Sequence, residues 1–520
     1  MAGTQGSQEV AGIPFAVRTA NGAGKLALVE QDLFGWLHVD RLELEVPGPD
    51  AAGPASRYQR RRTQVRIASL RVDQLAIDAR VEAAAAALAA HGITGVAARA
   101  TDGAIAISAR VADGLAASDV SFRVVLTSAG LAVRALAGAL RVHGHLPTPG
   151  PVIAHRVVEA LVAAVGGGEP GVTVRGLCDF EFDALGAFLW RLLPPAGWRL
   201  PSVAGIDLCA VRVGRGAIHL TYAPAAQRTA PRALDPATQL AAAHDAMRSA
   251  DELLRRGQLD EAMRGYRALV ASAPADHQPL LLERILAVGA ARPAWFTDAV
   301  ELARQALARW PAFAPARAAL ASIAIAKGDP RDAALHLQAL AQLAAADGDD
   351  DGAALAALAA ARLLRVLDPG AATALYQQVL DHRPGHPEAQ AALADRLADE
   401  QRWPELIRLL RARAAATIDR ARAARDHVRI AEVLALYLRD RASARAELER
   451  ARVLDPEEPV VHETLAMVAD DDGDRLGAIA AWTAVYDLAT ARRDAPGMAR
   501  ALARRARIRE EAGDIADADA

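Results

Sequence analysis

The chain has 520 residues, more than one ordinary hydrophobic core accommodates, so two or more domains are expected. Its residues are 52% apolar, which excludes a disordered chain. With 60 basic and 63 acidic residues, the net charge of −3 gives no overall reason to expect nucleic-acid binding. Only Lys25 and Lys327 are lysines, so the arginine excess indicates codon bias rather than phosphate recognition.

The beginning of the chain carries no recognisable export signal. Its first fifteen residues, MAGTQGSQEVAGIPF, lack both a basic stretch and an apolar stretch, and no apolar run anywhere reaches about 18 residues. The two cysteines, Cys178 and Cys209, form no CxxC motif and are expected to be reduced. We therefore expect a soluble, cytoplasmic, bacterial protein.

An arginine-rich stretch, RYQRRRTQVRIASLRV, spans residues 57–72. In strand alternation one face stays basic while the other becomes apolar, which is typical of a solvent-facing strand entry. The alternative is a contact with anionic lipid headgroups or with an acidic partner. The residues of that candidate contact are Arg57, Arg60, Arg61, Arg62 and Arg66.

The region up to residue 222 is predicted to be rich in strands. Alternation in RLELEV (41–46) predicts a strand with one buried face, and Asp102-Gly103 predicts a tight hairpin. A second turn is expected at Asp113-Gly114, two longer strands around 128–130, and a final hairpin in IDLCAVRVGRGAIHLTYA. Helices are predicted at about 79–90, 152–165 and 184–193.

Two segments of this region share a pattern. ARATDGAIAISA and VRVGRGAIHLTYA both contain a strand, a tight turn and then Gly-Ala-Ile, with Gly103 matching Gly216. Long antiparallel strands beside a few amphipathic helices resemble the tubular lipid-binding superfamily and its small bacterial relatives, over about residues 62–222. That resemblance implies an apolar groove that holds acyl chains; the alternative is an ordinary α+β domain with a packed core.

Several motifs fail when their context is considered. GGGEPG (166–171) has a helix before it and a proline inside it, where a dinucleotide site needs a strand before and a helix after. NGAGKL lacks the first glycine and the final hydroxyl of a phosphate-binding loop. No GxSxG, HExxH or Cys-His pattern occurs, so we predict no catalytic residue, no cofactor and no enzyme activity.

Two candidate metal patterns are weak. DGDDDG (347–352) matches the first positions of a calcium loop, but Leu358 stands where the bidentate glutamate belongs, so a solvated acidic loop is favoured. DDDGD (470–474) is interpreted in the same way. His143, His145 and His155 have no nearby acid or thiol to complete a site. We predict no metal site.

The second half of the chain repeats. A small residue or leucine, an aromatic or leucine four positions later and often a proline eight positions after that recur at intervals of 37, 34, 39, 34, 38 and 34 residues. A 34-residue helix-turn-helix unit with these residues resembles the tetratricopeptide repeat (TPR). The residues expected to pack the helices are Ala262, Tyr266, Ala299, Ala333, Ala372, Tyr376, Ala444, Ala478 and Trp482.

The resemblance implies a solenoid whose first helices line a surface for a protein or peptide partner. Family members that clamp a C-terminal carboxylate use lysine and asparagine on the first helix. Met247 and Asp251 stand at the expected positions, so that clamp is predicted to be missing.

We therefore predict two unlike parts. Residues 1–222 form a β-rich α+β domain, 223–236 a linker, and 237–520 an all-α, TPR-like solenoid of about seven repeats with a partial eighth. The predicted function is a non-enzymatic interaction scaffold or adaptor that holds its partner on the concave face of the solenoid. The alternative is a lipid-binding or lipid-transfer protein whose solenoid docks it to a partner; no nucleic acid and no transmembrane segment are expected.

Overall fold

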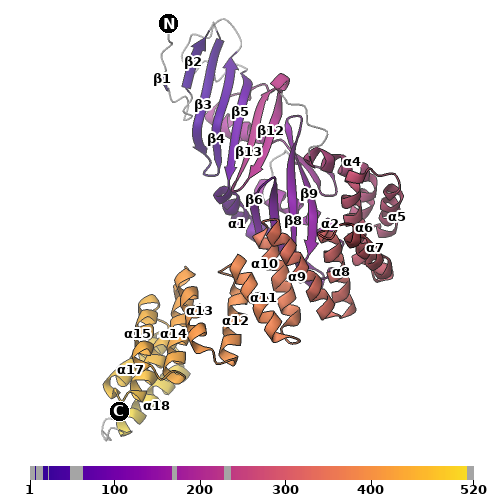
Figure 1. Ribbon diagram of the computed structural model, residues 1–520. Helices are drawn as coiled ribbons and strands as arrows, with labels where there is room; N and C mark the ends of the chain where they lie inside the picture. Colours follow the sequence, from indigo (N-terminus) through magenta and orange to yellow (C-terminus); the bar gives the residue numbers. More distant parts are fainter. Residues whose placement is uncertain are drawn as a thin grey trace. The chain divides into compact units, whose positions relative to one another are not determined.

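The computed structural model describes residues 6–7, 16–20, 23–46, 63–166, 172–227 and 236–511. The chain divides into two compact units, Met1–Leu364 and Arg365–Ala520. The first unit holds the strands and the helices up to α10, and the second unit holds helices from α11 onward (Figure 1). The domain limits predicted from the sequence, with a linker at 223–236, stay a prediction, and most of that linker lies outside the described residues.

The first sheet of the first unit is antiparallel throughout, in the order β1-β2-β3-β4-β5-β13-β12. Strand β13 pairs with β5, with Leu220 opposite Leu70, so residues from both ends of the strand region share this sheet. Its strands are β1 (Gly6–Ser7), β2 (Ala16–Ala20), β3 (Ala23–Leu33), β4 (Leu37–Val46), β5 (Gln64–Asp73), β12 (Ile206–Gly214) and β13 (Ala217–Pro224).

The second sheet is also antiparallel, in the order β10-β11-β9-β8-β7-β6. Gly103, with a φ of +83°, turns the predicted hairpin between β6 and β7, where Thr101 pairs with Ala104. Its strands are β6 (Ile93–Thr101), β7 (Ala104–Asp113), β8 (Ala116–Ala129), β9 (Ala132–Val142), β10 (Val172–Gly176) and β11 (Asp179–Phe182).

Three helices accompany the sheets: α1 (Gln74–Ala90), α2 (Gly150–Gly166) and α3 (Ala184–Leu192). Helix α3 begins where Asp183 accepts a hydrogen bond from the backbone N–H of Gly186 at 2.8 Å. It buries Phe188 and Leu192 in a core shared with the first sheet, whereas α1 and α2 bury residues in a core shared with the second sheet. All three helices lie close to their predicted positions.

Helices then follow one another in antiparallel pairs. Many begin with proline in their first turn, where its missing N–H costs nothing, and Gly328 ends α8 with a φ of +74°. In the first unit the pairs are α4 (Pro236–Arg255) with α5 (Leu259–Val270), α6 (Gln278–Ala290) with α7 (Phe296–Arg309), and α8 (Ala314–Lys327) with α9 (Pro330–Ala346); α10 (Asp350–Leu364), in the position of a first helix, packs on α9 and ends this unit. The second unit begins with α11 (Pro369–His382), continues with the pairs α12 (Pro387–Asp399) with α13 (Trp403–Ala416), α14 (Arg420–Leu436) with α15 (Arg441–Leu454), and α16 (Pro459–Asp471) with α17 (Arg475–Arg492), and ends with α18 (Ala495–Glu511), again in the position of a first helix.

This order confirms the predicted fold class: an antiparallel, β-rich α+β part followed by an all-α, TPR-like solenoid. The limit between the units falls between α10 and α11. Across the described residues, no helix combines the length and the apolar character needed to cross a membrane.

Candidate interaction surface

The nine residues predicted to pack the helix pairs are all buried: Ala262, Tyr266, Ala299, Ala333, Ala372, Tyr376, Ala444, Ala478 and Trp482. Small side chains allow the two helix axes of a pair to approach closely. In the second pair the closest approach is made by Gly289, where an added Cβ would meet the Cβ of Ala299 at 2.8 Å. Ala287, on the same helix, is only half-buried.

The first helix of each pair forms a surface that we call the helix-A face. In the first unit it consists of α4, α6, α8 and α10, and this face meets the second sheet. Helix α4 contacts β8, β9 and β10, helices α6 and α8 contact β9, and α10 contacts β8 (Figure 1). A TPR-like solenoid normally offers this face to a partner, but here the chain's own sheet covers it in the first unit.

The apolar part of this contact belongs to one continuous core. Met247 and Ile285, on α4 and α6, share a cluster of buried side chains with Phe122 of β8 and Phe180 of β11. Burial of this kind stabilises by roughly 25 cal/mol for each Å² of apolar surface removed from water. Met247, one of the two expected clamp positions, is therefore a core residue and is not available to a peptide.

The second expected clamp position, Asp251, belongs to a buried polar cluster. Its Oδ1 accepts hydrogen bonds from the hydroxyl of Tyr266 at 2.5 Å and from Arg284 Nε at 3.3 Å. Arg284, with 0% exposure, also reaches Glu283 Oε1 from its Nη1 at 3.4 Å. Burial raises the pKa of Asp251 and of Glu283, and the positive charge of Arg284 opposes that rise.

A second ion-pair group joins α4 to the sheet. Arg134 of β9 donates to both carboxylate oxygens of Asp179 on β11, at 2.9 and 2.8 Å. The same guanidinium reaches Asp245 of α4, with Nη2 at 2.8 Å from Oδ1. The neighbouring His244 is buried, and its burial together with the charges of Arg284 and Arg134 holds its pKa well below the usual value.

The acidic segment DGDDDG turns out to be a third contact. Arg141 of β9, with 5% of its side chain exposed, lies 3.3 Å from Asp347 and 3.3 Å from Asp349, and Arg99 of β6 donates to Asp351 at 2.5 Å. Asp349 also caps α10, because it accepts the Gly352 N–H at 2.9 Å. The interpretation as a solvated loop is therefore wrong: arginines from two strands neutralise these carboxylates against the sheet.

The remaining acidic run and the three histidines have separate environments. In DDDGD, Asp474 caps α17 by accepting the Gly477 N–H at 2.9 Å. His143 Nε2 lies 2.9 Å from Ser121 Oγ, His145 Nδ1 lies 3.1 Å from Ser322 Oγ, and His155 stacks on Phe180. His143 and His155 are buried and His145 is half-buried, and the described residues do not gather the three around one point.

The helix-A face of the second unit is different, because it exposes apolar side chains. Met467 of α16 is 57% exposed, and Leu502 of α18 and Val460 of α16 are 44% and 43% exposed. Tyr437, just after α14, is 57% exposed, but its ring stacks on Trp403 of α13, a second helix, so it lies outside this face. Several exposed large apolar residues on one face are a feature of interaction surfaces.

Most of the predicted arginine contact lies outside the described residues, namely Arg57, Arg60, Arg61 and Arg62. Arg66 is described: it is exposed on β5 and donates from Nε to the Glu45 carboxylate of the neighbouring strand β4. This pairing satisfies its charge within the sheet. The headgroup contact therefore stays a prediction.

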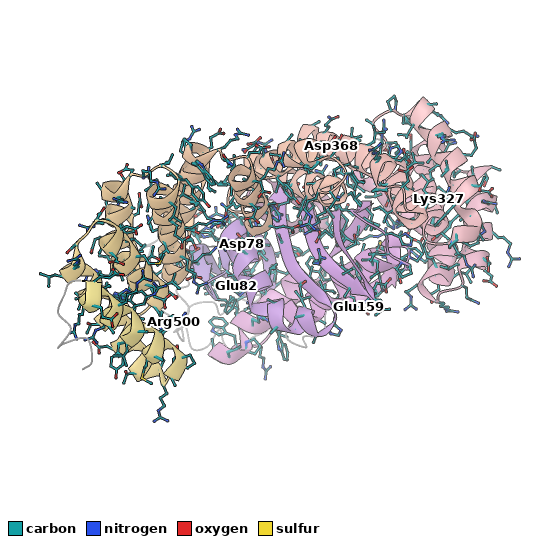
Figure 2. The ribbon with its side chains drawn as sticks, turned by 90° about the horizontal axis from the view of Figure 1, so that it is seen from below. Asp78, Glu82, Glu159, Lys327, Asp368 and Arg500 are labelled. Atoms are coloured by element: carbon teal, nitrogen blue, oxygen red, sulfur yellow. The ribbon has the colours of Figure 1, made fainter. Side chains whose placement is uncertain are left out.

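A hollow of about 510 Å³ lies between α1 and β6. Its wall is apolar, with Val81, Leu88 and Ile93 among its lining residues, and Asp78 and Glu82 stand at its rim one helical turn apart on α1 (Figure 2). The size suits a small-molecule ligand. The acidic rim disfavours an anionic headgroup.

Comparisons with known proteins find only partial structural likeness. MamA from Desulfovibrio magneticus RS-1 has 21% identity and a TM-score of 0.25 over 34% of this chain and 96% of that one. PilF of Pseudomonas aeruginosa has 17% identity and a TM-score of 0.26 over 44% of this chain and 99% of that one. A tetratricopeptide repeat protein from Parabacteroides merdae has 13% identity and a TM-score of 0.26 over 47% and 91%.

No protein-family model and no curated protein matches the chain. At these TM-scores the likeness to solved structures adds nothing to the repeat assignment. That assignment rests on the order of the helix pairs and on the buried residues at their contacts.

Proposed function

We propose that this protein is a non-enzymatic scaffold that holds a protein partner on the helix-A face of its second unit. The observation that supports this proposal is the contrast between the two units. The helix-A face is covered by the chain's own sheet in the first unit, whereas in the second unit it exposes Val460, Met467 and Leu502. A partner that buries these side chains would be stabilised by the removal of apolar surface from water, as the contact with the sheet is in the first unit.

Affinity purification of the full chain from its native cells tests the proposal. The double variant Met467→Glu, Leu502→Glu places two charges on the helix-A face, so a specific partner should be lost from the purified material. Val453→Glu is the matched control, because Val453 is 78% exposed on α15, the second helix of its pair. A partner retained by the double variant, equal loss with the control, or recovery of no partner would contradict the proposal.

The lipid-binding alternative rests on the hollow between α1 and β6, the described feature closest to the groove that the sequence resemblance implies. An acyl chain bound along Val81, Leu88 and Ile93 would cover the apolar wall of the hollow and shield it from water. Native mass spectrometry of the full chain tests this alternative. An added mass that disappears in Val81→Trp, which fills the hollow, would support it, and a bare protein mass would reject it.

A further inference from the structure

Four side chains that ligate metals in other proteins stand together on the outer face of the first sheet. Glu30 and Asp32 lie on β3, and His38 and Asp40 lie on β4. The strand register pairs Asp32 with His38 and places Glu30 opposite Asp40, between the pairs Val29–Arg41 and Gln31–Val39. The contacts of His38 with Glu30, Asp32 and Asp40 bring the four side chains together, while Leu37 and Val39 enter the core.

The distances within this group match those between ligands of one metal ion. His38 Nε2 lies 3.1 Å from Glu30 Oε2 and 3.5 Å from Asp40 Oδ1. One donor atom from each of the three residues lies within 4.8 Å of the others. Ligands at about 2.1 Å from a tetrahedral or octahedral ion are separated by about 3.0 to 3.4 Å, so little adjustment would be needed.

Asp32 supplies the outer partner that metal-binding histidines usually have. Its Oδ1 lies 2.7 Å from His38 Nδ1, and this contact leaves Nε2 directed between Glu30 and Asp40. The imidazole is held firmly, since only 12% of the His38 side chain is exposed. A hydrogen bond donated by Nδ1–H to Asp32 favours the tautomer in which Nε2 is the atom available to coordinate a metal ion.

The charge balance of the group also favours a cation. Glu30 and Asp40 are like charges close together on neighbouring strands, an arrangement that destabilises a strand pair. Arg71 offsets part of the negative charge, but it lies 3.8 Å from Asp40 and is closer to Asp73, at 3.1 Å.

We propose that Glu30, His38 and Asp40 bind one divalent transition-metal ion of the zinc class, with Asp32 as a positioning residue. One imidazole nitrogen and two carboxylate oxygens form a mixed donor set that zinc accepts, and water completes the coordination. The site joins two neighbouring strands on the surface of the sheet. It is independent of the helix-A face and of the proposed scaffold function.

Titration calorimetry of the metal-free full chain with zinc chloride tests the proposal, with magnesium chloride as the comparison. The wild type should bind one zinc ion at this site and bind magnesium much more weakly. His38→Ala and the double variant Glu30→Gln, Asp40→Asn should each abolish this binding. His91→Ala, which removes an exposed histidine at the end of α1, should leave it unchanged.

Asp32 requires a separate measurement, because it acts through His38. Asp32→Asn should weaken zinc binding by about 10- to 100-fold without changing the stoichiometry, and Asp32→Glu should restore most of the affinity. Circular dichroism spectra that match the wild type establish that each variant is folded. No zinc binding by the wild type, or wild-type binding by folded His38→Ala, would overturn the proposal.

Discussion

At the scale of single residues, Arg284 shows how the chain commits a charged group to its interior. It is fully buried on the helix-A face of the second pair, and Asp251 supplies the compensating carboxylate from the preceding pair. A buried ion pair adds little net stability relative to apolar side chains, but it is costly to break. The pair therefore fixes the position of α6 relative to α4 more than it strengthens the fold.

Asp251→Ala should destabilise the first unit by about 3 to 5 kcal/mol, because it leaves the guanidinium of Arg284 buried without its partner and removes the acceptor of Tyr266. The free energy of unfolding in urea, monitored by hydrogen exchange of the amides of α4 and α6, measures this effect. Asp260→Ala breaks an exposed pair with Arg292, 2.8 Å long, and should change stability by less than about 1 kcal/mol. Equal effects of the two substitutions would contradict the assignment.

His143 predicts a dependence of stability on pH. Burial, reinforced by the charge of Arg141, lowers the pKa of His143 to about 4 from its usual value of 6.5, so the unfolded chain binds its proton more readily. The stability due to neutral His143 is complete above pH 6.5 and is lost as the pH falls towards 4. Between pH 7 and pH 5 this amounts to about 2 kcal/mol.

His143→Gln removes the titrating group and retains a side chain that can bond to Ser121. We expect the variant to lose about 2 kcal/mol less stability than the wild type between pH 7 and pH 5. Urea unfolding of both proteins at the two pH values provides the comparison. The same pH dependence in both proteins would show that His143 is not the group responsible.

At the scale of elements, the two acidic turns show how one motif serves two purposes. Both DGDDDG and DDDGD connect helices, and both contain an aspartate that caps the following helix. Only the first meets arginines from strands, Arg99 and Arg141. The acidic residues of the first turn therefore attach α10 to the sheet.

Asp351→Ala should loosen α10, because it frees Arg99 and removes a carboxylate with only 8% of its side chain exposed. We expect faster hydrogen exchange of the amides of α10. High salt should increase the exchange rate further, because it screens the remaining ion pairs of Arg141 with Asp347 and Asp349. The matched control is Asp470→Ala in the second acidic turn, where the side chain is exposed and exchange in α16 should stay unchanged. An unaltered α10 in Asp351→Ala would contradict the role of this turn.

The elements themselves could be predicted from local sequence, and their contacts could not. Asp102-Gly103, the alternation of RLELEV and the recurring alanines indicate hairpins, strands and helix pairs because each depends on neighbouring residues. The pairing of Arg141 with Asp349 joins residues 208 positions apart, and no local pattern reveals it. An indirect signal existed: Asp251 and Arg284 are opposite charges on neighbouring first helices, at positions where a solenoid exposed to water needs no buried charge.

At the scale of the whole molecule, the candidate metal site was missed for a similar reason. Glu30 and Asp32 lie in a stretch with no recognisable ligand spacing, and His38 and Asp40 join them only through the register of β3 and β4. Likewise, the repeats alone do not show that the helix-A face is covered in the first unit, because the cover is the second sheet, which comes from another part of the sequence. A repeat pattern identifies a solenoid without showing which of its surfaces is free.

The most direct test of this account measures whether the helix-A face of the first unit is covered in solution. Met247→Cys and Met467→Cys each place one thiol on that face, in the first and second unit respectively, in a Cys209→Ser background. The native Cys178 is buried and its pKa is raised to about 12, so it should not react. Labelling with a thiol reagent at neutral pH should modify the cysteine at 467 rapidly and the cysteine at 247 only as fast as the first unit unfolds. Equal labelling rates at the two positions would show that the sheet does not cover this face, and would contradict the account.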